Sequence, residues 1–337
     1  MNHAVPIATE TVNPRSTTAD TVLVMAGASD TTARQVAAAL EKLHCRVWWF
    51  DTADFPQRAA LSVELDGERW AGLLRGPAGS LELDRVGAVY MRRPGAFVPP
   101  VHLTEAERWH AAMESRYGIA GVLASLPVRW CNRPASSADA AYKARQLTDF
   151  ATCGLAVPPT LVTTNPESVR EFAAAHGPIV CKPVAVGVLH TDGGAVAVYT
   201  RLLTEADLAD LSGLEYAPHL FQAYVPKLYE VRLTVVGEQF FAVRIDAGSP
   251  RSRVDWRTDY LALSYELTDT PPEVRAGVLN YLRSADLAYG AFDFVVTPEQ
   301  EWVALECNPE GQWEWLAYET GAPIAEAIAD YLTEGLT

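Results

Sequence analysis

Three polar side chains interrupt an apolar stretch near the end of the chain. The stretch AFDFVVTPEQEWVALECNPEGQWEWL at 291–316 contains Asp293, Glu306 and Asn308. Because successive strand side chains alternate between faces, Glu306 and Asn308 point to the same side, and a turn at TPEQE brings Asp293 opposite them. The apolar residues between them are expected on the other face: Phe292, Phe294, Leu305 and Cys307. Hard oxygen ligands that leave room for water and phosphate suit Mg²⁺, whereas an ordinary polar strand edge is the alternative interpretation.

Two lysines lie upstream in apolar surroundings. Lys143 occurs in AAYKARQL and Lys182 occurs in PIVCKPV. A lysine ammonium enclosed by apolar residues requires an anionic partner, and a nucleotide phosphate can be that partner. For each lysine taken singly, a surface side chain that reaches solvent on its long stem is the alternative. Both lysines upstream of an acidic hairpin favour a site for a nucleotide and a metal ion.

The first 130 residues are typical of an open α/β unit. TVLVMAG at 21–27 and CRVWWFD at 45–51 predict strands, and the periodic segment between them predicts a helix, which favours parallel pairing. A hairpin is expected around Asp66-Gly67. Thr104 and Glu107 form a capping-box pattern at the start of a long helix.

The rest of the chain predicts α+β structure. Ser137 is expected to cap a helix that carries Lys143 and ends at Gly154. Strand-like segments follow, interrupted by the loop VGVLHTDGG and by the polar segment AGSPRSRVDWRTDY at 247–260. The predicted divisions are a disordered tail at 1–20, an N-terminal α/β domain at 21–130, a central subdomain at 131–215 and a C-terminal subdomain at 216–337.

Composition restricts the classes of partner. The chain has 337 residues, with 27 Lys and Arg against 42 Asp and Glu, and a formal net charge of −15. Without a long basic run, this charge argues against a nucleic-acid partner. No apolar stretch approaches the roughly 20 residues of a membrane helix, and the first residues do not resemble a signal peptide, so a cytoplasmic location is expected. The five scattered cysteines form no CxxC pair and are interpreted as reduced thiols.

The order of these motifs resembles the ATP-grasp superfamily. The matching segments are AAYKARQL, IVCKPV, FQAYVPKLYEVRLTVVG at 221–237, YGAFDFVV at 289–296 and LECNPEGQW at 305–313. The resemblance implies an ATP-grasp fold, α/β in class and α+β in its C-terminal half, with an N-terminal pre-grasp domain and with ATP held between two antiparallel-sheet layers. The implied nucleotide contacts are Lys143, Lys182, Gln222, Ala223, Tyr224, Val225 and Glu230, and the implied Mg²⁺ ligands are Asp293, Glu306 and Asn308. In this assignment the lysines contact the phosphates and the adenine side, the backbone of 223–225 holds the adenine edge, and Glu230 holds the ribose hydroxyls. Many relatives have an acidic residue where this chain has Ala223.

Within that superfamily, VYMRRP, NRP, the Glu230-x-Arg232 pair and DWR at 255–257 resemble the graspetide maturases. The resemblance implies an ATP-dependent ligase whose partner is a ribosomally made precursor peptide with a leader and an acidic, Thr-rich core. Such an enzyme links Asp or Glu side chains of the core to Thr, Ser or Lys side chains as esters or amides. A homodimer or higher homo-oligomer is also expected.

Arginines are expected to neutralise and orient the reacting anions. Arg232 lies two residues after Glu230 and shares its strand face, which would let it reach the transferring phosphoryl group. Arg244 on the next strand is a second catalytic candidate, with an ion pair to Asp246 as the alternative. The expected substrate-binding arginines are Arg92, Arg93, Arg251, Arg253 and Arg257. HTDGG and the polar segment 247–260 are expected to close over the site as lids.

Two other functions remain open from the sequence. A ligase similar to the D-alanine ligases would add a free amino acid to a protein or small acid and would need no leader peptide. An inactive nucleotide-binding regulatory protein would use the same fold, although the intact lysines and metal ligands argue against it.

Overall fold

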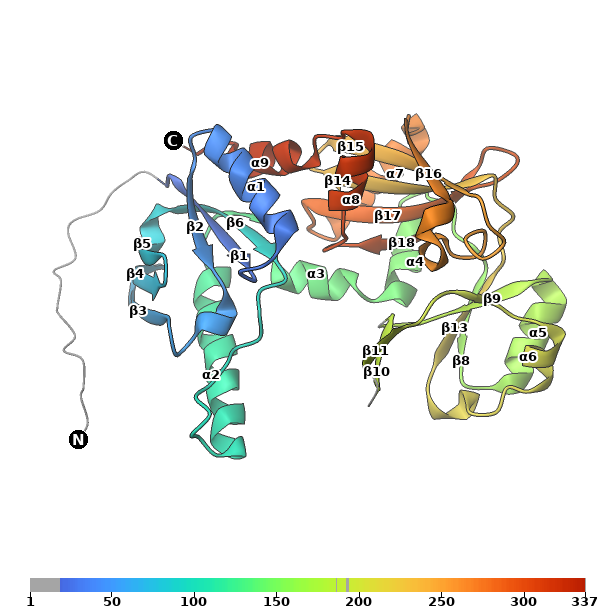
Figure 1. Cartoon of the computed structure of the whole chain (residues 1–337), viewed down its shortest axis with the longest axis horizontal. Coiled ribbons are helices and arrows are strands. Elements are labelled where there is room, and N and C mark those ends of the chain that lie inside the picture. Colours follow the sequence, from blue (N-terminus) through green and yellow to red (C-terminus); the bar gives the residue numbers. More distant parts are fainter. Residues whose placement is uncertain (1–18, 186, 192–193, 337) are drawn as a thin grey trace. The chain divides into compact units, whose positions relative to one another are not determined.

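The computed structural model describes residues 19–185, 187–191 and 194–336, and the chain divides into two compact units. The first unit covers the chain up to Cys131 together with Ala329–Thr337, and the second covers Asn132–Ile328 (Figure 1). Of the predicted tail at 1–20, only the last two residues are described, and there the Arg85 Nε donates to the Asp20 Oδ1 at 3.1 Å. Within the described ranges, none of the helices has the length and hydropathy of a membrane-spanning segment.

The first unit is built on a parallel sheet, as the alternation of strand and helix predicts. Its strand order is β2-β1-β6-β7, and every pairing is parallel. β1 is buried along its whole length, which is typical of a central parallel strand. Thr104 and Glu107 form the predicted capping box at the start of α2. The elements of this part are β1 (Thr21–Ala26), α1 (Thr31–Lys42), β2 (Arg46–Phe50), β6 (Val86–Arg92), α2 (Glu105–Ala124) and β7 (Arg129–Cys131).

A small antiparallel sheet belongs to the same unit. β3 (Ala60–Asp66) and β4 (Arg69–Gly76) form the predicted hairpin. Gly67 in its turn has a φ of 66°, a left-handed conformation that glycine adopts without steric cost. β5 (Gly79–Glu82) pairs with β4 as a third strand, which the sequence did not predict.

The second unit contains two larger antiparallel sheets, and the first of them has the strand order β12-β9-β13-β8. Because β13 pairs with β8 and β9, the change from one sheet to the next falls after Ala223 rather than at the predicted boundary of 215 and 216. A separate hairpin follows β9. The elements are β8 (Thr160–Thr163), α5 (Pro166–His176), β9 (Ile179–Lys182), β10 (Val188–Thr191), β11 (Gly194–Ala197), β12 (Arg201–Leu202), α6 (Glu205–Ala209) and β13 (His219–Ala223).

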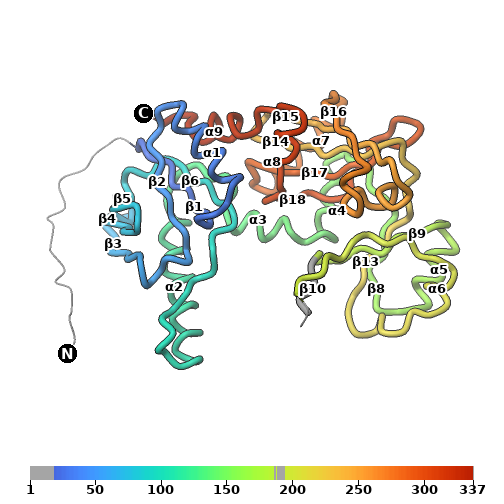
Figure 2. Tube along the Cα trace, in the orientation of Figure 1, coloured from blue at the N-terminus to red at the C-terminus, as the bar shows by residue number. Residues whose placement is uncertain are grey.

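The other sheet of this unit has five strands in the order β16-β15-β14-β17-β18, and the path of the chain through it can be followed in Figure 2. One face of this sheet carries the core: Val231, Leu233, Phe292 and Phe294 pack with side chains from α4 (Lys143–Thr152) and α7 (Pro272–Ser284). Alternation therefore leaves Glu230, Arg232 and Asp293 on the opposite face. The elements are β14 (Tyr229–Val236), β15 (Gln239–Ala247), β16 (Leu263–Thr268), α7 (Pro272–Ser284), β17 (Tyr289–Val296), β18 (Trp302–Asn308) and α8 (Glu314–Thr320). The last helix, α9 (Ile324–Thr333), begins in this unit and ends in the first.

The predicted helix around Lys143 is two helices. α3 (Pro134–Ala140) ends before α4 (Lys143–Thr152) begins, and Ser137 lies inside α3 instead of capping a longer helix. Lys143 is therefore the first residue of α4 and not an interior one. This position projects its side chain from the beginning of the helix, toward the ends of β9 and β18.

Candidate active site

A row of charged side chains crosses three neighbouring strands of the five-stranded sheet. The register places Arg232 on β14 opposite Asp293 on β17, and Asp293 opposite Glu306 on β18. The Arg232 Nη1 lies 2.8 Å from the Asp293 Oδ1, and the Lys143 Nζ lies 3.0 Å from the Glu306 Oε2. The register thus confirms that Asp293 and Glu306 face each other across two strands. Each carboxylate therefore forms an ion pair, Asp293 with Arg232 and Glu306 with Lys143.

Burial and the neighbouring cations act in opposite directions on the two carboxylates. Burial raises the pKa of Asp293 in spite of the Arg232 guanidinium. Burial alone would also raise the pKa of Glu306, but Lys143 and Arg257 outweigh it and lower that pKa to about 2. Glu306 is therefore held as a carboxylate at neutral pH, which is the form that binds a metal ion.

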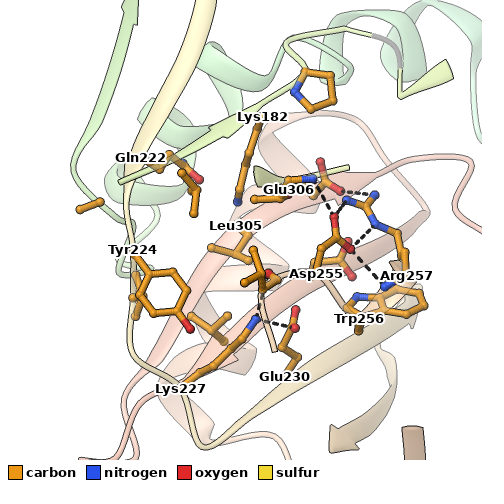
Figure 3. A pocket seen from close by; sticks show the side chains of 18 of the residues that line it. Lys182, Gln222, Tyr224, Lys227, Glu230, Asp255, Trp256, Arg257, Leu305 and Glu306 are labelled. Atoms are coloured by element: carbon orange, nitrogen blue, oxygen red, sulfur yellow. Dashed lines mark hydrogen bonds and ion pairs between the residues drawn. The ribbon is translucent and has the colours of Figure 1, made fainter. Parts of the chain in front are cut away.

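A β-bulge interrupts β18 beside this row. The pairing of β17 with β18 shifts between Asp293 and Phe294, so Leu305 has no residue directly opposite it. The bulge turns Leu305 toward the cavity next to Glu306, as Figure 3 shows. The prediction that Leu305 faces away from the site is wrong, because strict alternation does not hold across a bulge. The other residues predicted for the far face do lie in the core: Phe292, Phe294 and Cys307.

A cavity lies over the charged row, between residues of the two sheets of the second unit. Its lining includes most of the predicted nucleotide and metal residues: Lys143, Lys182, Gln222, Ala223, Tyr224, Val225, Glu230, Asp293 and Glu306. In Figure 3, Lys182 extends from β9 into the cavity toward Glu306, while Gln222 and Tyr224 border one side. Cations and carboxylates that converge in one cavity suit a polyphosphate accompanied by a metal ion.

Gln222 offers the cavity a hydrogen-bond acceptor with a defined orientation. The Gln222 Nε2 donates to the Thr160 Oγ1 at 3.0 Å, and the Thr160 hydroxyl donates to the Pro158 carbonyl oxygen at 2.8 Å. Because the hydroxyl proton is already used, the Gln222 amide must direct its Nε2 at Thr160, and its Oε1 is left as an acceptor. This buried Oε1 has no hydrogen-bond partner among the described residues. An amino group of a bound base can supply the missing donor.

The backbone of 223–225, predicted to hold the adenine edge, is only partly available for a ligand. The Ala223 N–H donates to the Pro159 carbonyl at 3.0 Å, and the Tyr224 N–H donates to the Pro178 carbonyl at 2.8 Å. The Val225 N–H, in contrast, donates to no acceptor in the part of the chain that the structure describes. Val225 and Gln222 therefore present one donor and one acceptor at the same end of the cavity.

Two further titratable groups of the cavity are moved toward neutral pKa values. Burial lowers the pKa of Lys182 to about 8. Burial raises the pKa of Glu230 to about 7, against the opposing effect of Lys227, whose Nζ lies 2.6 Å from the Glu230 Oε1. The sequence reasoning missed Lys227, although its position three residues before Glu230 in VPKLYE was a usable signal.

The polar segment 247–260 contributes Arg257 to the cavity. The short helix η4 (Trp256–Thr258) begins after Asp255, whose buried carboxylate accepts hydrogen bonds from the Arg257 Nε at 2.8 Å and Nη2 at 2.7 Å. Asp255 also accepts from the Thr200 N–H at 2.9 Å, which connects the segment to the residue directly before β12. The Arg257 Nη1 lies 4.0 Å from the Glu306 Oε1 (Figure 3). Two other arginines of the segment are exposed and do not line the cavity: Arg251 and Arg253.

The side chains beside the charged row fit Mg²⁺ by their chemistry. Asp293 and Glu306 supply carboxylates, and the Asn308 Nδ2 lies 3.5 Å from the Glu306 Oε1, which leaves the Asn308 Oδ1 as a third oxygen. No three His, Cys, Asp or Glu side chains gather as a metal site among the residues described. Mg²⁺ usually binds one or two carboxylates and keeps water and substrate phosphates as its other ligands. The metal-ligand role of these residues stays a prediction.

Arg244 lies on the other face of the sheet. It stands opposite Val231, whose side chain is in the core, and its guanidinium makes two hydrogen bonds of 2.7 Å with Asp246. The guanidinium also stacks over the Tyr229 ring, 4.2 Å from its centroid. The catalytic prediction for Arg244 is therefore wrong, and the ion pair with Asp246 is the correct interpretation. Arg232 stands opposite Val243, so Arg244, one residue further along β15, points to the other side.

Arg92 and Arg93 belong to the first unit, at the end of β6. Arg92 is buried, and its Nε lies 3.8 Å from the Oδ2 of Asp30, the N-cap residue of α1. Arg93 is exposed and has a φ of 45°. The substrate contact predicted for this pair stays a prediction, and so does the lid role of HTDGG, of which 192–193 lie outside the described residues.

Comparisons with known proteins agree with this geometry. Residues 21–137 match the family described as the MvdD pre-ATP grasp domain, and no curated protein matches the chain significantly. The chain is similar to a RiPP-associated ATP-grasp ligase of Chryseobacterium gregarium, which was solved in complex with ADP and a leader and core peptide. The identity is 28% and the TM-score is 0.86, and the alignment covers 94% of this chain and 97% of that one. It is similar to macrocyclase MdnC of Microcystis aeruginosa MRC, bound with precursor peptide MdnA, with 30% identity, a TM-score of 0.81, and coverage of 94% and 100%. Macrocyclase MdnB of the same organism gives 30% identity, a TM-score of 0.77 and the same coverage.

These similarities extend over nearly the whole chain and include both units. Two relatives at 30% identity are covered over their full length. The chain belongs to the ATP-grasp ligases that modify ribosomally made peptides, the graspetide maturases.

Proposed function

We propose that this protein is an ATP- and Mg²⁺-dependent ligase that joins Asp or Glu side chains of a ribosomally made precursor peptide to Thr or Ser hydroxyls or Lys amines. The products are macrocyclic esters or amides. One observation carries the proposal: Asp293 and Glu306, which face each other on neighbouring strands, line a cavity that Lys143 and Lys182 also line. The class of partner is supported by the solved relatives, one in complex with a leader and core peptide and another with its precursor.

The two ends of the cavity suit the two ends of ATP. Lys143 and Lys182 supply positive charge for the phosphates, and Glu230 can accept hydrogen bonds from the ribose hydroxyls. At the other end, the Gln222 Oε1 accepts from the amino group of adenine while the Val225 N–H donates to a ring nitrogen. Guanine presents a carbonyl oxygen where adenine has this amino group, so the acceptor on Gln222 favours ATP over GTP.

Asp293, Glu306 and the Asn308 Oδ1 would hold Mg²⁺. When bound, the ion neutralises negative charge that develops on the transferring phosphoryl group. Arg232 and Lys143 keep the two carboxylates oriented through their ion pairs. The side chains are thus arranged in a charge-balanced set that requires little rearrangement when the substrates bind.

The proposed reaction has two steps. A carboxylate oxygen of the peptide attacks the γ-phosphorus of ATP, the bond from that phosphorus to the bridging oxygen breaks, and ADP leaves. A hydroxyl oxygen or amine nitrogen of the peptide then attacks the acyl carbon of the acyl phosphate. The bond from that carbon to the phosphate oxygen breaks, and the departing phosphate takes up the proton of the nucleophile. The peptide therefore loses one water for each bond formed.

Two anions meet in the first step, so their repulsion has to be offset by cations. Arg257 projects into the cavity beside Glu306, and Arg232 lies behind Asp293 in the same row. A guanidinium can hold a carboxylate with two parallel hydrogen bonds and so orient it for attack. Arg251 and Arg253, exposed on the same segment as Arg257, are available to the acidic residues of the core that are not reacting.

Mass spectrometry of the precursor tests the proposal. The precursor is expected to be a short peptide with a Thr- and Asp/Glu-rich tail, and after incubation with the enzyme, ATP and Mg²⁺ it should lose the mass of one water per bond. Asp293→Asn and Glu306→Gln should abolish this loss. Arg244→Ala is the matched control, because it removes a guanidinium from the opposite face of the same sheet and should leave the reaction intact.

Dehydration that persists in both carboxylate variants would contradict the proposal. Turnover of a free amino acid without any leader peptide would favour the ligase type that modifies proteins or small acids. An absence of phosphate release with every acidic peptide tested would favour an inactive nucleotide-binding protein.

A further inference from the structure

α4 presents a second polar side chain to the strand that carries Glu306 and Asn308. Gln146 is 3% exposed and lies three residues after Lys143, on the same side of the helix. Its Nε2 donates to the Cys307 carbonyl oxygen at 2.7 Å, and its Oε1 accepts from the Cys307 N–H at 3.0 Å. The Nε2 also donates to the Ala140 carbonyl oxygen. Both amide protons are therefore used, and the orientation of the amide is fixed.

β18 needs such a partner because it is the edge strand of its sheet. The peptide groups of an edge strand point alternately toward its neighbour and away from it, and those pointing away are unpaired unless something covers them. The N–H and C=O of Cys307 point away from β17, and Gln146 pairs with both. The bulge at Leu305 interrupts the ladder with β17 immediately before this point. The segment from Glu306 to Asn308 is thus a short strand end whose position depends on β17 on one side and on Gln146 of α4 on the other.

We propose that Gln146 is a positioning residue for the Mg²⁺ ligands. By binding both peptide groups of Cys307, it fixes the backbone between Glu306 and Asn308, so that the Asn308 amide stays beside the Glu306 carboxylate, with its Nδ2 3.5 Å from the Glu306 Oε1. The inference rests on the proposed role of these two residues as metal ligands. Residues that orient metal ligands without touching the metal commonly affect its binding.

The same helix links this strand to the phosphate-binding side. The Lys143 Nζ lies 3.0 Å from the Glu306 Oε2 and donates to the Pro183 carbonyl oxygen at 3.0 Å, directly after Lys182. One turn of α4 therefore contacts β18 through Gln146 and the end of β9 through Lys143. This arrangement sets the spacing between the lysines of the cavity and the metal ligands.

Binding of Mn²⁺ in the presence of ADP, followed by electron paramagnetic resonance, tests the proposal without requiring turnover. Gln146→Leu removes both hydrogen bonds to Cys307, and the dissociation constant of Mn²⁺ should rise by about 10–100-fold. Gln146→Glu keeps an acceptor for the Cys307 N–H but turns a carboxylate oxygen toward the Cys307 and Ala140 carbonyl oxygens, so the dissociation constant of Mn²⁺ should rise in this variant as well. ADP affinity measured without a divalent ion should not change in either variant.

Leu147→Ala is the matched control. Leu147 is the next residue of α4 and is buried in the core, so its truncation lowers stability without removing a hydrogen bond to β18. It should bind Mn²⁺ with the wild-type dissociation constant. If Gln146→Leu does not fold, the dissociation constant of Mn²⁺ measured for Gln146→Glu tests the proposal.

A folded Gln146 variant with the wild-type dissociation constant would overturn the proposal. An equal loss of Mn²⁺ affinity in Leu147→Ala would also overturn it, because the effect would then follow from stability. A wild-type protein that binds ADP but no Mn²⁺ would overturn the proposed metal site itself, and this outcome is distinct from the other two.

Discussion

Lys182 and Glu230 face the same cavity with pKa values that burial has moved in opposite directions. Burial lowers the pKa of Lys182 to about 8 and raises that of Glu230 to about 7. Between these values the lysine is protonated and the glutamate is ionised. These are the charge states that favour a phosphate at Lys182 and ribose hydroxyls at Glu230.

We expect ADP affinity to be greatest between pH about 7 and about 8. Below this window Glu230 gains a proton and is a poorer acceptor, and above it Lys182 loses its charge. Lys182→Arg should remove the alkaline decrease, because a guanidinium does not titrate there. Glu230→Gln should remove the acidic decrease. Calorimetric titrations with ADP across neutral pH check this, and an alkaline decrease that persists in Lys182→Arg would assign it to another group.

Arg232 allows binding and chemistry to be separated. Arg232→Lys keeps a positive charge beside Asp293 but loses the second nitrogen of the fork, which donates to the Gln312 carbonyl oxygen at 3.4 Å and is proposed to orient a carboxylate or phosphoryl group during the reaction. ADP affinity should stay the same, whereas dehydration of the precursor should slow by about 100-fold or more, the size of effect seen when one stabilising donor is lost. Single-turnover kinetics with saturating ATP measure this rate. Wild-type turnover in the variant would leave Arg232 with a structural role only.

At the scale of elements, a buried carboxylate is one of the groups that attach the polar segment 247–260 to the rest of the second unit. Asp255 accepts hydrogen bonds from Arg257 and from the Thr200 N–H. Burial opposes ionisation of Asp255, but its hydrogen bonds with Arg257 outweigh this and lower its pKa. The anchor is therefore charged throughout the neutral pH range.

Loss of this anchor should release the segment. Asp255→Ala should speed tryptic cleavage after the exposed Arg251 and Arg253, because local opening limits proteolysis of a folded chain. Asp246→Ala is the control, since Asp246 pairs with Arg244 on the other face of the sheet. The cleavage rates are read from gel time courses. Equal rates in the two variants would show that Asp255 does not hold the segment.

Elements also show which features the sequence could predict. The sequence could predict that Asp293 and Glu306 face each other, because this requires only side-chain alternation along two strands and one turn between them. No residue type signals the bulge at Leu305 or the break between α3 and α4, so side-chain alternation and helical periodicity could not predict them. The side of the sheet on which Arg244 lies could also have been predicted, because it depends only on the register of the β14–β15 hairpin.

Side chains that act through the backbone are harder to find from sequence. Gln146 lies in the motif around Lys143, but a glutamine on a helix is common and does not by itself indicate a function. Its role depends on an edge strand that lies far away in sequence and pairs with the amide only in the folded chain. Asp255 was visible as part of DWR, but its bond to Thr200 was not.

At the scale of the whole molecule, the net charge of −15 bears on how an acidic peptide approaches. An excess of negative charge repels such a peptide at long range, whereas Arg251, Arg253 and Arg257 attract it at short range. Salt separates the two effects, because the Debye length falls from about 30 Å at 0.01 M to about 8 Å at 0.15 M ionic strength. Contacts at the arginines are shorter than either length and are screened less.

The association rate constant for an acidic precursor should therefore rise as salt is increased over this range, because long-range repulsion is screened first. Replacing Arg251 and Arg253 by Ser should lower affinity at every salt concentration. The control replaces Arg145 and Arg170, which are exposed in the same unit and change the net charge equally, and it should leave affinity close to that of the wild type. Stopped-flow fluorescence with a labelled precursor measures both constants. A rate constant that falls with salt would mean that the local arginines, rather than the overall charge, govern the encounter.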